Sequence, residues 1–361
     1  MNVHAVARGK EAAGNNLERT VEKVLSRNIE GLKPLDGLEL DLGVTPKDVI
    51  YARGTMKLYH YRPMCDEVYR VPIVLVMSLI NRYYIVDLAS GQSLVEYLLQ
   101  QGFDVYLIDW GVVRSGYEHL NMDHYVGEYI PECLEQVAEE SGEREYSMVG
   151  YCLGGVMACM HAALNPNAGL RNLGCFATPA NASGMVLYKS WADGENFDID
   201  RIVDELGNVP AVMVDAMLQA LRPLQKSAGR MSLLDNVGND EFVKAHYRFE
   251  RWTSDPVPLA GEVARQLYKH FLRDNKFIQS SFEVKGEKAD LKNITCPFLH
   301  VAAVHDHIVP SDASKDLIDA VGSTDKLEVV VKGGHVSLVA GGNAVYRLWP
   351  QLVDWLSARS C

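Results

Sequence analysis

A short glycine-rich segment at residues 150–155 constrains this chain more than any other feature. The β-rich apolar run 146–149 leads directly into Gly-Tyr-Cys-Leu-Gly-Gly, and the helix-compatible residues 156–158 follow. A turn this tight between a strand and a helix requires glycines two positions before and after its central residue, because Cβ atoms there would collide. We therefore predict a sharp strand-to-helix turn that presents Cys152 at a helix N-terminus. There the helix dipole favours a thiolate, and the amide of Leu153 can contribute to an oxyanion hole.

Other parts of the chain predict a parallel sheet around this turn. Short, continuous apolar runs separated by helical patterns are typical of strands that are buried on both faces of a parallel sheet. Such runs occur at residues 73–77, 105–108, 146–149, 173–177, 297–304 and 327–331. At least six strands with crossover helices indicate a doubly wound α/β fold.

The strand pattern is interrupted once and is absent at the start of the chain. Residues 1–50 are polar and rich in Gly and Pro, so we predict an N-terminal arm with one helix at 17–27. Residues 179–290 are aromatic and helix-compatible, which indicates a largely helical inserted cap. The predicted core comprises residues 51–178 and 291–361.

Two further residues complete a nucleophile, acid and base in chain order. Asp306 follows the predicted strand 297–304, and His335 follows the strand 327–331 after a glycine pair. Active-site residues collect at the carboxyl ends of parallel strands, and the order Cys, Asp, His is that of the α/β-hydrolase triad. We therefore predict an α/β-hydrolase fold with Cys152, Asp306 and His335 as the catalytic triad.

Several residues compete for these roles. A loop Asp is more often a turn or cap residue, and a loop His is often simply solvated. We prefer His335 because only this histidine follows the last predicted core strand with glycines that let its loop reach back to the turn, and we expect its rivals to orient their loop. The competing residues are His305 and His307 for the base, and Asp87, Asp109 and Asp325 for the acid.

Charge and composition exclude several classes of protein. The formal net charge of −12 argues against a nucleic-acid partner, because phosphate binding needs clustered Lys and Arg. The longest apolar stretch, 74–80, is far shorter than the roughly 20 residues that cross a bilayer. We expect no transmembrane segment and no secretory signal, and therefore a cytoplasmic protein. The seven scattered cysteines form neither metal-ligand pairs nor a disulfide framework, so we predict no metal site.

Several segments together resemble the polyhydroxyalkanoate (PHA) synthases, over about residues 50 to 355. They are 76–88, 102–111, 150–155, 290–294, 306–310 and 333–335. The chain is most similar to the short catalytic subunit of the two-component, class III enzymes. The resemblance implies an acyltransferase that polymerises (R)-3-hydroxyacyl-coenzyme A (CoA) to a polyester with release of CoA. It also implies that the chain acts together with a second synthase subunit at the surface of cytoplasmic polyester granules. The resemblance is compatible with a homo-oligomer.

The resemblance also implies roles for individual residues. Cys152 would carry the growing polyester as a thioester, and His335 would activate the thiol. Asp306 would either orient the histidine or help to deprotonate the incoming hydroxyl group. A second oxyanion donor would come from the backbone at Ile80 or Asn81, and we choose Ile80. No cofactor is implied, since CoA arrives with the substrate, and the sequence identifies no residues that bind it.

Three alternatives remain open from the sequence. The turn motif also resembles that of dienelactone hydrolases, which are smaller and lack a long cap, and a cysteine-dependent thioesterase would share the same triad. A non-catalytic scaffold is disfavoured because scaffolds of this origin usually lose a triad residue. Two neighbouring features have a structural interpretation: we expect Arg82 to pair with Asp87 or Asp109, and Trp110 to lie in the core.

Overall fold

The computed structural model describes residues 40, 42–193, 197–221, 225–236 and 238–361. The chain divides into two compact units. One comprises residues 42–221 and 254–361, and the other combines residues 1–41 with 222–253. The predicted helix at 17–27 lies outside the described residues.

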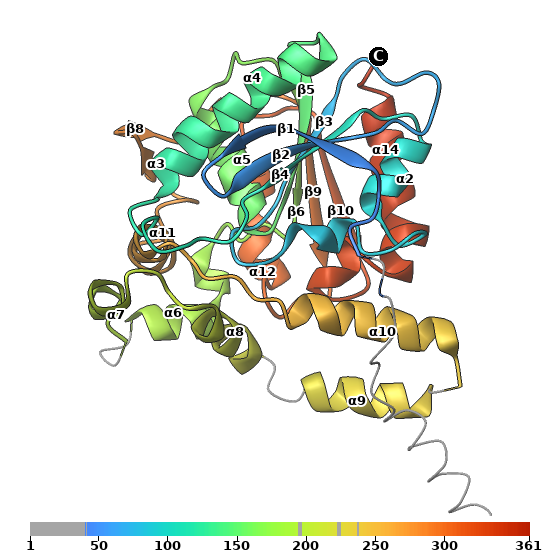
Figure 1. The fold of residues 1–361 in the computed structure, drawn as a ribbon. Helices are drawn as coiled ribbons and strands as arrows, with labels where there is room; N and C mark the ends of the chain where they lie inside the picture. The colour runs from blue at the N-terminus through green and yellow to red at the C-terminus, as the bar shows by residue number, and fades with distance from the viewer. Residues whose placement is uncertain (1–39, 41, 194–196, 222–224, 237) are drawn as a thin grey trace, which may run out of the picture. The chain divides into compact units, whose positions relative to one another are not determined.

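The larger unit is built on an eight-stranded sheet with the order β1-β2-β4-β3-β5-β6-β9-β10 (Figure 1). The pairs β1–β2 and β2–β4 are antiparallel, and every later pair is parallel. The strands are β1 (Lys47–Arg53), β2 (Met56–Tyr61), β3 (Ile73–Val76), β4 (Val105–Asp109), β5 (Tyr146–Tyr151), β6 (Leu170–Phe176), β9 (Phe298–Ala303) and β10 (Lys326–Val331). The mostly parallel sheet confirms the predicted fold class.

Helices cover both faces of this sheet. Figure 1 shows α4 and α5 on one face and α2 and α14 on the other. Every residue of β3, β5 and β9 is buried, as expected for central strands between two helical layers. The helices of this core are η1 (Tyr83–Val86), α2 (Leu94–Gln100), α3 (Met122–His124), η2 (Tyr125–Tyr129), α4 (Ile130–Ser141), α5 (Leu153–Leu164), η5 (Leu291–Asn293), α12 (Ser311–Ser314), α13 (Asp316–Ala320), η6 (His335–Leu338), η7 (Ala344–Leu348) and α14 (Trp349–Ser357).

The segment between β6 and β9 is largely helical. In the larger unit it contributes η3 (Ala182–Gly184), α6 (Val186–Asp193), α7 (Ile199–Leu206), α8 (Ala211–Ala220), α11 (Gly261–Gln266), η4 (Leu267–Arg273) and a small hairpin of β7 (Glu283–Val284) and β8 (Glu287–Lys288). The smaller unit holds α9 (Gln225–Asp235) and α10 (Asp240–Thr253), and α10 has Asp240 and Glu241 in its first turn, where acidic side chains complement the helix dipole. No helix among the described residues has both the length and the apolar composition to cross a membrane.

The six strands predicted from apolar runs are all present, but two other strands of the eight-stranded sheet, and the small hairpin of β7 and β8, were not predicted. β1 and β2 form an antiparallel hairpin at one end of the sheet. β1 begins at Lys47, so the sheet starts within the segment predicted to be an arm. β2 alternates between buried and exposed positions at its start, and β1 has no fully buried residue, so neither shows the continuous apolar run used for the prediction.

Candidate functional site

The turn at Cys152 has the strained geometry that the sequence predicts. Cys152 lies between β5 and α5 with φ 56° and ψ −123°, a backbone conformation that is unusual for a residue with a side chain. A Cβ atom on Gly150 would lie 2.5 Å from the Cα atom of Gly155. A Cβ atom on Gly154 would overlap the carbonyl oxygen of Val76 at the end of β3. The glycines therefore let α5 approach the sheet closely enough to hold the strained residue.

The third glycine of the motif has a partner that was not predicted. A Cβ atom on Gly155 would overlap the hydroxyl oxygen of Thr178, which follows β6 and is fully buried. Thr178 therefore packs directly against the first turn of the helix that begins after Cys152. The sequence argument concerned only Gly150 and Gly154, and nothing in the sequence identified this contact of Gly155.

Asp306 and His335 are brought together because β9 and β10 are parallel neighbours. Asp306 lies just beyond β9, and His335 begins η6 just beyond β10. One carboxylate oxygen of Asp306, Oδ1, accepts hydrogen bonds from the amides of Ile308 (2.9 Å) and Val309 (2.8 Å). The other, Oδ2, lies 2.7 Å from Nδ1 of His335. Both side chains are buried, so the carboxylate is fixed in place and fixes the imidazole in turn.

The electrostatics of His335 link it to both other members of the predicted triad. Burial alone opposes protonation of the imidazole and lowers its pKa. The charges of Asp306 and Cys152 and hydrogen bonds to both outweigh this effect and raise the pKa of His335 to about 10. A buried imidazolium between a carboxylate and a sulfur is the arrangement of a cysteine–histidine ion pair. The site can therefore hold a sulfur nucleophile beside a proton carrier.

The competing acids have other partners, and His305 faces solvent beside Asp306. Asp87 accepts hydrogen bonds from Thr45 (2.5 Å) and Ser93 (2.9 Å), and Asp109 accepts one from the amide of Gly111 (3.0 Å). Asp325 forms an ion pair with Arg359, with 2.9 Å between Nη2 and Oδ2. His305 is exposed, and its amide donates to the carbonyl of Gly333 (2.8 Å), which ties together the loops that carry Asp306 and His335.

The loop after β3 differs in part from expectation. Arg82 forms an ion pair with Asp255 (2.9 Å from Nε to Oδ2), and the hydroxyl of Tyr84 donates to the same carboxylate (2.8 Å). Burial raises the pKa of Asp109, one of the two expected partners, and the charge of Arg82 acts to lower it. The contact with Asp255 was not predicted, because this residue is 173 positions further along the chain. Trp110 is buried as expected, and its indole nitrogen donates to the carbonyl of Met77 (2.7 Å).

The two predicted oxyanion donors have different surroundings. Leu153 is the first residue of α5, where backbone amides have no acceptor within the helix. The amide of Ile80 lies 3.4 Å from the hydroxyl oxygen of Ser78, so it already has a long hydrogen bond. Both belong to segments that adjoin the turn, because Gly154 abuts the carbonyls of Val76 and Met77.

Two tyrosines near these groups were not predicted as site residues. Tyr151, the last residue of β5, is buried, and its ring centroid lies 5.0 Å from that of His335. Tyr188 on α6 is also buried, and burial together with the charges of Cys152 and Asp306 raises its pKa. Tyr151 occupies the variable position of the glycine-rich motif, which is the only signal in the sequence that could have drawn attention to it.

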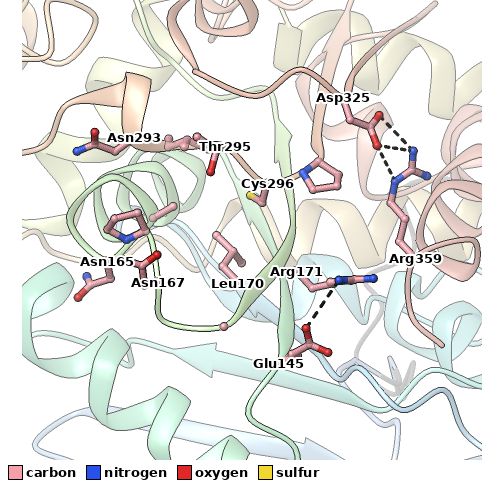
Figure 2. A pocket seen from close by; sticks show the side chains of 15 residues that line it. Glu145, Asn165, Asn167, Leu170, Arg171, Asn293, Thr295, Cys296, Asp325 and Arg359 are labelled. Atoms are coloured by element: carbon pink, nitrogen blue, oxygen red, sulfur yellow. Dashed lines mark hydrogen bonds and ion pairs between the residues drawn. The ribbon is translucent and has the colours of Figure 1, made fainter.

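A separate cavity of about 530 Å³ lies at the opposite edge of the sheet (Figure 2). Residues just before β5, β6, β9 and β10 line it, among them Glu145, Gly169, Pro297 and Asp325. The cavity thus opens at the amino ends of the strands, whereas Cys152, Asp306 and His335 follow the carboxyl ends. Within the described part of the chain, no group of three or more His, Cys, Asp or Glu residues is placed to hold a metal ion.

Comparisons with known proteins agree with this architecture. Residues 72–341 match the family model of the α/β hydrolase fold, and residues 4–98 match that of the poly-beta-hydroxybutyrate polymerase (PhaC) N-terminus. Among solved structures, a putative lipase from Sulfolobus solfataricus superposes with a TM-score of 0.57 at 14% identity, covering 87% of this chain and 98% of the lipase. A monoacylglycerol lipase from Paleococcus ferrophilus gives 0.53 at 18% identity, covering 83% and 99%. Identities this low show the fold alone.

Similar sequences are more informative about the family. The chain is 34% identical to the poly(3-hydroxyalkanoate) polymerase subunit PhaC of Allochromatium vinosum, over 93% of this chain and 94% of that protein. The subunit of the same name from Synechocystis sp. is 32% identical over 95% and 93%. That of Haloferax mediterranei is 37% identical over 89% of this chain and 66% of its own length.

Proposed function

Because this chain belongs to the family of poly(3-hydroxyalkanoate) polymerase PhaC subunits, we propose that it polymerises (R)-3-hydroxyacyl groups from CoA thioesters into a polyester and releases CoA. The chain is an enzyme of the acyltransferase type on an α/β-hydrolase fold. The observation that carries the proposal is the buried hydrogen bond between Asp306 and His335, with Cys152 close enough to influence the pKa of the imidazole.

The first step would load an acyl group onto Cys152. The sulfur attacks the carbonyl carbon of the CoA thioester as a thiolate, because the raised pKa of His335 keeps the imidazole protonated at neutral pH. As the tetrahedral intermediate collapses, the sulfur of CoA leaves and takes the proton from Nε2 of His335. The products are an acyl thioester on Cys152, free CoA and a neutral imidazole.

The second step would extend the polyester. The 3-hydroxyl group of another hydroxyacyl-CoA attacks the thioester on Cys152, and the neutral His335 accepts the hydroxyl proton. An ester bond forms, Cys152 leaves as a thiolate, and the imidazolium is restored. Repetition of the first step then returns the lengthened chain from CoA to Cys152. Thioester exchange suits this cycle, because its attacking and leaving groups are both thiols and the acyl group stays activated.

Asp306 is best suited to orienting the histidine. Its Oδ2 atom is 2.7 Å from Nδ1 of His335, so Nε2 is the nitrogen left to exchange protons with substrate and sulfur. Direct deprotonation of the incoming hydroxyl by Asp306 would have to compete with this hydrogen bond. We assign the oxyanion hole to the amides of Leu153 and Ile80, with the Ile80 amide turning from Ser78 to the substrate oxygen.

The remaining assignments follow from the family. We propose that the chain works with a second synthase subunit at the surface of cytoplasmic polyester granules, and that it needs no cofactor beyond the CoA of its substrate. Relatives from three organisms are themselves named polymerase subunits, which supports a second component.

The proposal is tested with purified protein and 3-hydroxybutyryl-CoA, with and without a candidate second subunit. Free thiol release and insoluble polyester are measured together, and the peptide that contains Cys152 is examined by mass spectrometry for a hydroxyacyl adduct. Cys152→Ser is expected to reduce thiol release by at least about 100-fold, since it removes the nucleophile. Cys65→Ser, at a half-exposed thiol outside the site, is the matched control and should behave as the unmodified protein does.

The outcomes separate the alternatives. Thiol release with polymer and a Cys152 adduct supports the synthase. Release of free 3-hydroxybutyrate without polymer would identify a thioesterase. The absence of both thiol release and adduct, even with the second subunit present, would overturn the proposal.

A further inference from the structure

Tyr151 lies directly against the imidazole of His335 but has no part in the steps described above. It is the last residue of β5 and precedes Cys152 in the chain. Its ring centroid is 5.0 Å from that of His335, with 40° between the ring planes. The side chain is only 3% exposed, so this contact is part of the packed interior and not a surface encounter.

The contact with Tyr151 restricts a tilting motion of the His335 ring that the hydrogen bond to Asp306 still allows. Asp306 accepts a hydrogen bond only from Nδ1 of the imidazole, in a direction close to the ring plane. A single bond at one nitrogen allows the ring to tilt about that bond and to carry Nε2 away from the sulfur. An aromatic ring packed against the imidazole, here at an angle of 40°, opposes this tilt, because van der Waals contact in a close-packed interior resists small displacements.

The position of Tyr151 in the chain makes this restraint rigid. β5 is hydrogen-bonded on both sides, to β3 and to β6, so its last residue has little freedom to move. The amide of the next residue, Cys152, donates to the carbonyl of Phe176 on β6 (2.9 Å). The nucleophile and the ring against the base therefore come from consecutive residues of one fixed strand end.

The hydroxyl group of Tyr151 is not what holds it in place. The hydroxyl oxygen is buried and has no hydrogen-bond partner among the described residues. Burial of an unpartnered hydroxyl is unfavourable, so the useful part of this side chain in the resting protein is its ring. A phenylalanine would supply the same ring without this penalty.

We propose that Tyr151 is a positioning residue, whose ring holds the imidazole of His335 in line with the sulfur of Cys152. The inference rests on the proposed function in assigning Cys152 and His335 as nucleophile and base. It predicts that loss of the ring weakens the thiolate–imidazolium pair even when the protein remains folded. Retention of the ring without the hydroxyl should preserve the pair.

The experiment measures the thiolate of Cys152 without requiring polymerisation. Wild type, Tyr151→Leu and Tyr151→Phe are treated with iodoacetamide between pH 5 and 10, and alkylation of the Cys152 peptide is followed by mass spectrometry. Thiolate is the reactive form, so each unit by which the apparent pKa of alkylation rises lowers the rate at lower pH by about tenfold. We expect Tyr151→Leu to raise that apparent pKa by about one unit or more, and Tyr151→Phe to stay within about threefold of the wild-type rate.

Tyr106→Leu is the matched control. Tyr106 is a buried tyrosine of β4 that stacks on another histidine, His60, with ring centroids 4.3 Å apart. The same substitution there removes a tyrosine–histidine contact outside the site. Circular dichroism and melting temperature are recorded for every variant, so that alkylation is compared only at temperatures where all are folded.

Each outcome bears on the inference. A raised alkylation pKa in Tyr151→Leu, with Tyr106→Leu unchanged, supports the positioning role. An unchanged profile in folded Tyr151→Leu, or an equal shift in Tyr106→Leu, would overturn it. If wild type shows the low-pH alkylation and Tyr151→Leu loses it, but 3-hydroxybutyryl-CoA yields no polymer, the proposed polymerase function fails while the role of Tyr151 stands.

Discussion

At the scale of single residues, the candidate site is held by backbone groups as much as by side chains. Two amides, from Ile308 and Val309, fix one oxygen of Asp306 and leave the other for His335. Those amides also compensate for the burial of a carboxylate, which would otherwise be unfavourable. The acid is therefore held in a single orientation before any substrate arrives.

Asp306→Asn tests this orientation. The amide is nearly isosteric but carries no charge, so it removes the main influence that raises the pKa of His335 and allows the wrong tautomer. We expect the rate of CoA release to fall by about 10²- to 10⁴-fold, with a smaller effect on the melting temperature. Steady-state thiol release from 3-hydroxybutyryl-CoA is the measurement.

Asp325→Asn serves as the comparison for that substitution. Asp325 is also an acid at the edge of β10, but it is paired with Arg359 and lines the opposite edge of the sheet. Its loss should leave thiol release within about twofold, as is usual for an exposed ion pair. A fall of similar size in both variants would contradict the assignment of Asp306.

Gly154 gives a prediction about stability. A methyl group there would overlap the carbonyl oxygen of Val76. That oxygen belongs to the backbone of β3, so moving it would disturb the strand and cost free energy. We expect Gly154→Ala to lower the free energy of unfolding by about 3 kcal/mol. Chemical denaturation followed by circular dichroism measures the change.

A second glycine provides the control for Gly154. A Cβ atom on Gly174, in β6, would come no closer than 3.4 Å to the side chain of Val149, which is ordinary contact. Gly174→Ala should therefore change the free energy of unfolding by less than about 1 kcal/mol. Equal losses at the two positions would show that the close approach at Gly154 is not the cause.

At the scale of elements, the strands that the sequence predicted are those that contain a continuous apolar run. The central strands are buried on both faces, and each appears as an apolar run that no other structure explains as well. β1 and β2 lie at one end of the sheet, where β1 keeps exposed residues such as Asp48 and Val49. A strand with a partly solvated face has no such run, so local sequence did not separate this hairpin from a polar arm.

The candidate site likewise has features that the sequence predicts and features that it does not. The positions of Cys152, Asp306 and His335 could be predicted because each follows a recognisable strand, and parallel strands bring their carboxyl ends to one edge. The contacts between Thr178 and Gly155, or between Asp255 and Arg82, depend on the path of the chain through distant segments. No local pattern encodes such pairings, so only the structure could supply them.

One cluster between elements makes the stability depend on pH. His60 on β2 contacts Asp104 before β4 (2.8 Å) and Glu140 on α4 (3.5 Å), and its ring stacks on Tyr106. Burial opposes protonation of His60, but the hydrogen bond and the charge of Asp104, with that of Glu140, outweigh it and raise its pKa. Its stabilising effect is therefore complete below the unfolded pKa of about 6.5 and is lost as pH rises through the higher folded value.

His60→Phe is expected to remove this dependence while keeping a ring on Tyr106. The melting temperature of the wild type should exceed that of the variant most at pH 6, and the difference should shrink by pH 9. His119→Phe, at an exposed histidine, is the control and should show no such trend. A difference that stays constant from pH 6 to pH 9 would argue against His60 as the titrating group.

At the scale of the larger unit, the edge of the sheet at the carboxyl ends of the parallel strands differs in function from the edge at their amino ends. The carboxyl edge carries the candidate catalytic groups, and the amino edge carries the polar cavity lined by Glu145 and Arg171 (Figure 2). In parallel sheets ligands and reactions occur at the carboxyl edge, where the loops after successive strands converge. This cavity is therefore not the expected place of reaction.

A pair of arginine substitutions tests this division. Arg82 lies in the loop that carries Ile80, and its ion pair with Asp255 holds this loop. Arg82→Ala should therefore displace the proposed oxyanion donor and lower the turnover number roughly tenfold. Arg171→Ala, in the amino-edge cavity, should leave turnover within about twofold. Turnover is measured as thiol release at saturating 3-hydroxybutyryl-CoA, and a larger loss from Arg171→Ala than from Arg82→Ala would reverse the assignment of the edges.

The crowding around Cys152 has a practical consequence for anyone who wishes to redesign the polymer that such an enzyme makes. Because the backbone of β3 and the hydroxyl of Thr178 fill the space beside Gly154 and Gly155, a library randomised at residues 150–155 would consist mostly of chains that fold poorly. Diversity is tolerated where side chains face open solvent, as Val186 and Val212 do at 75% and 71% exposure on α6 and α8. Substitutions are therefore better placed at exposed positions of α6 and α8, with the strand-to-helix turn left unchanged.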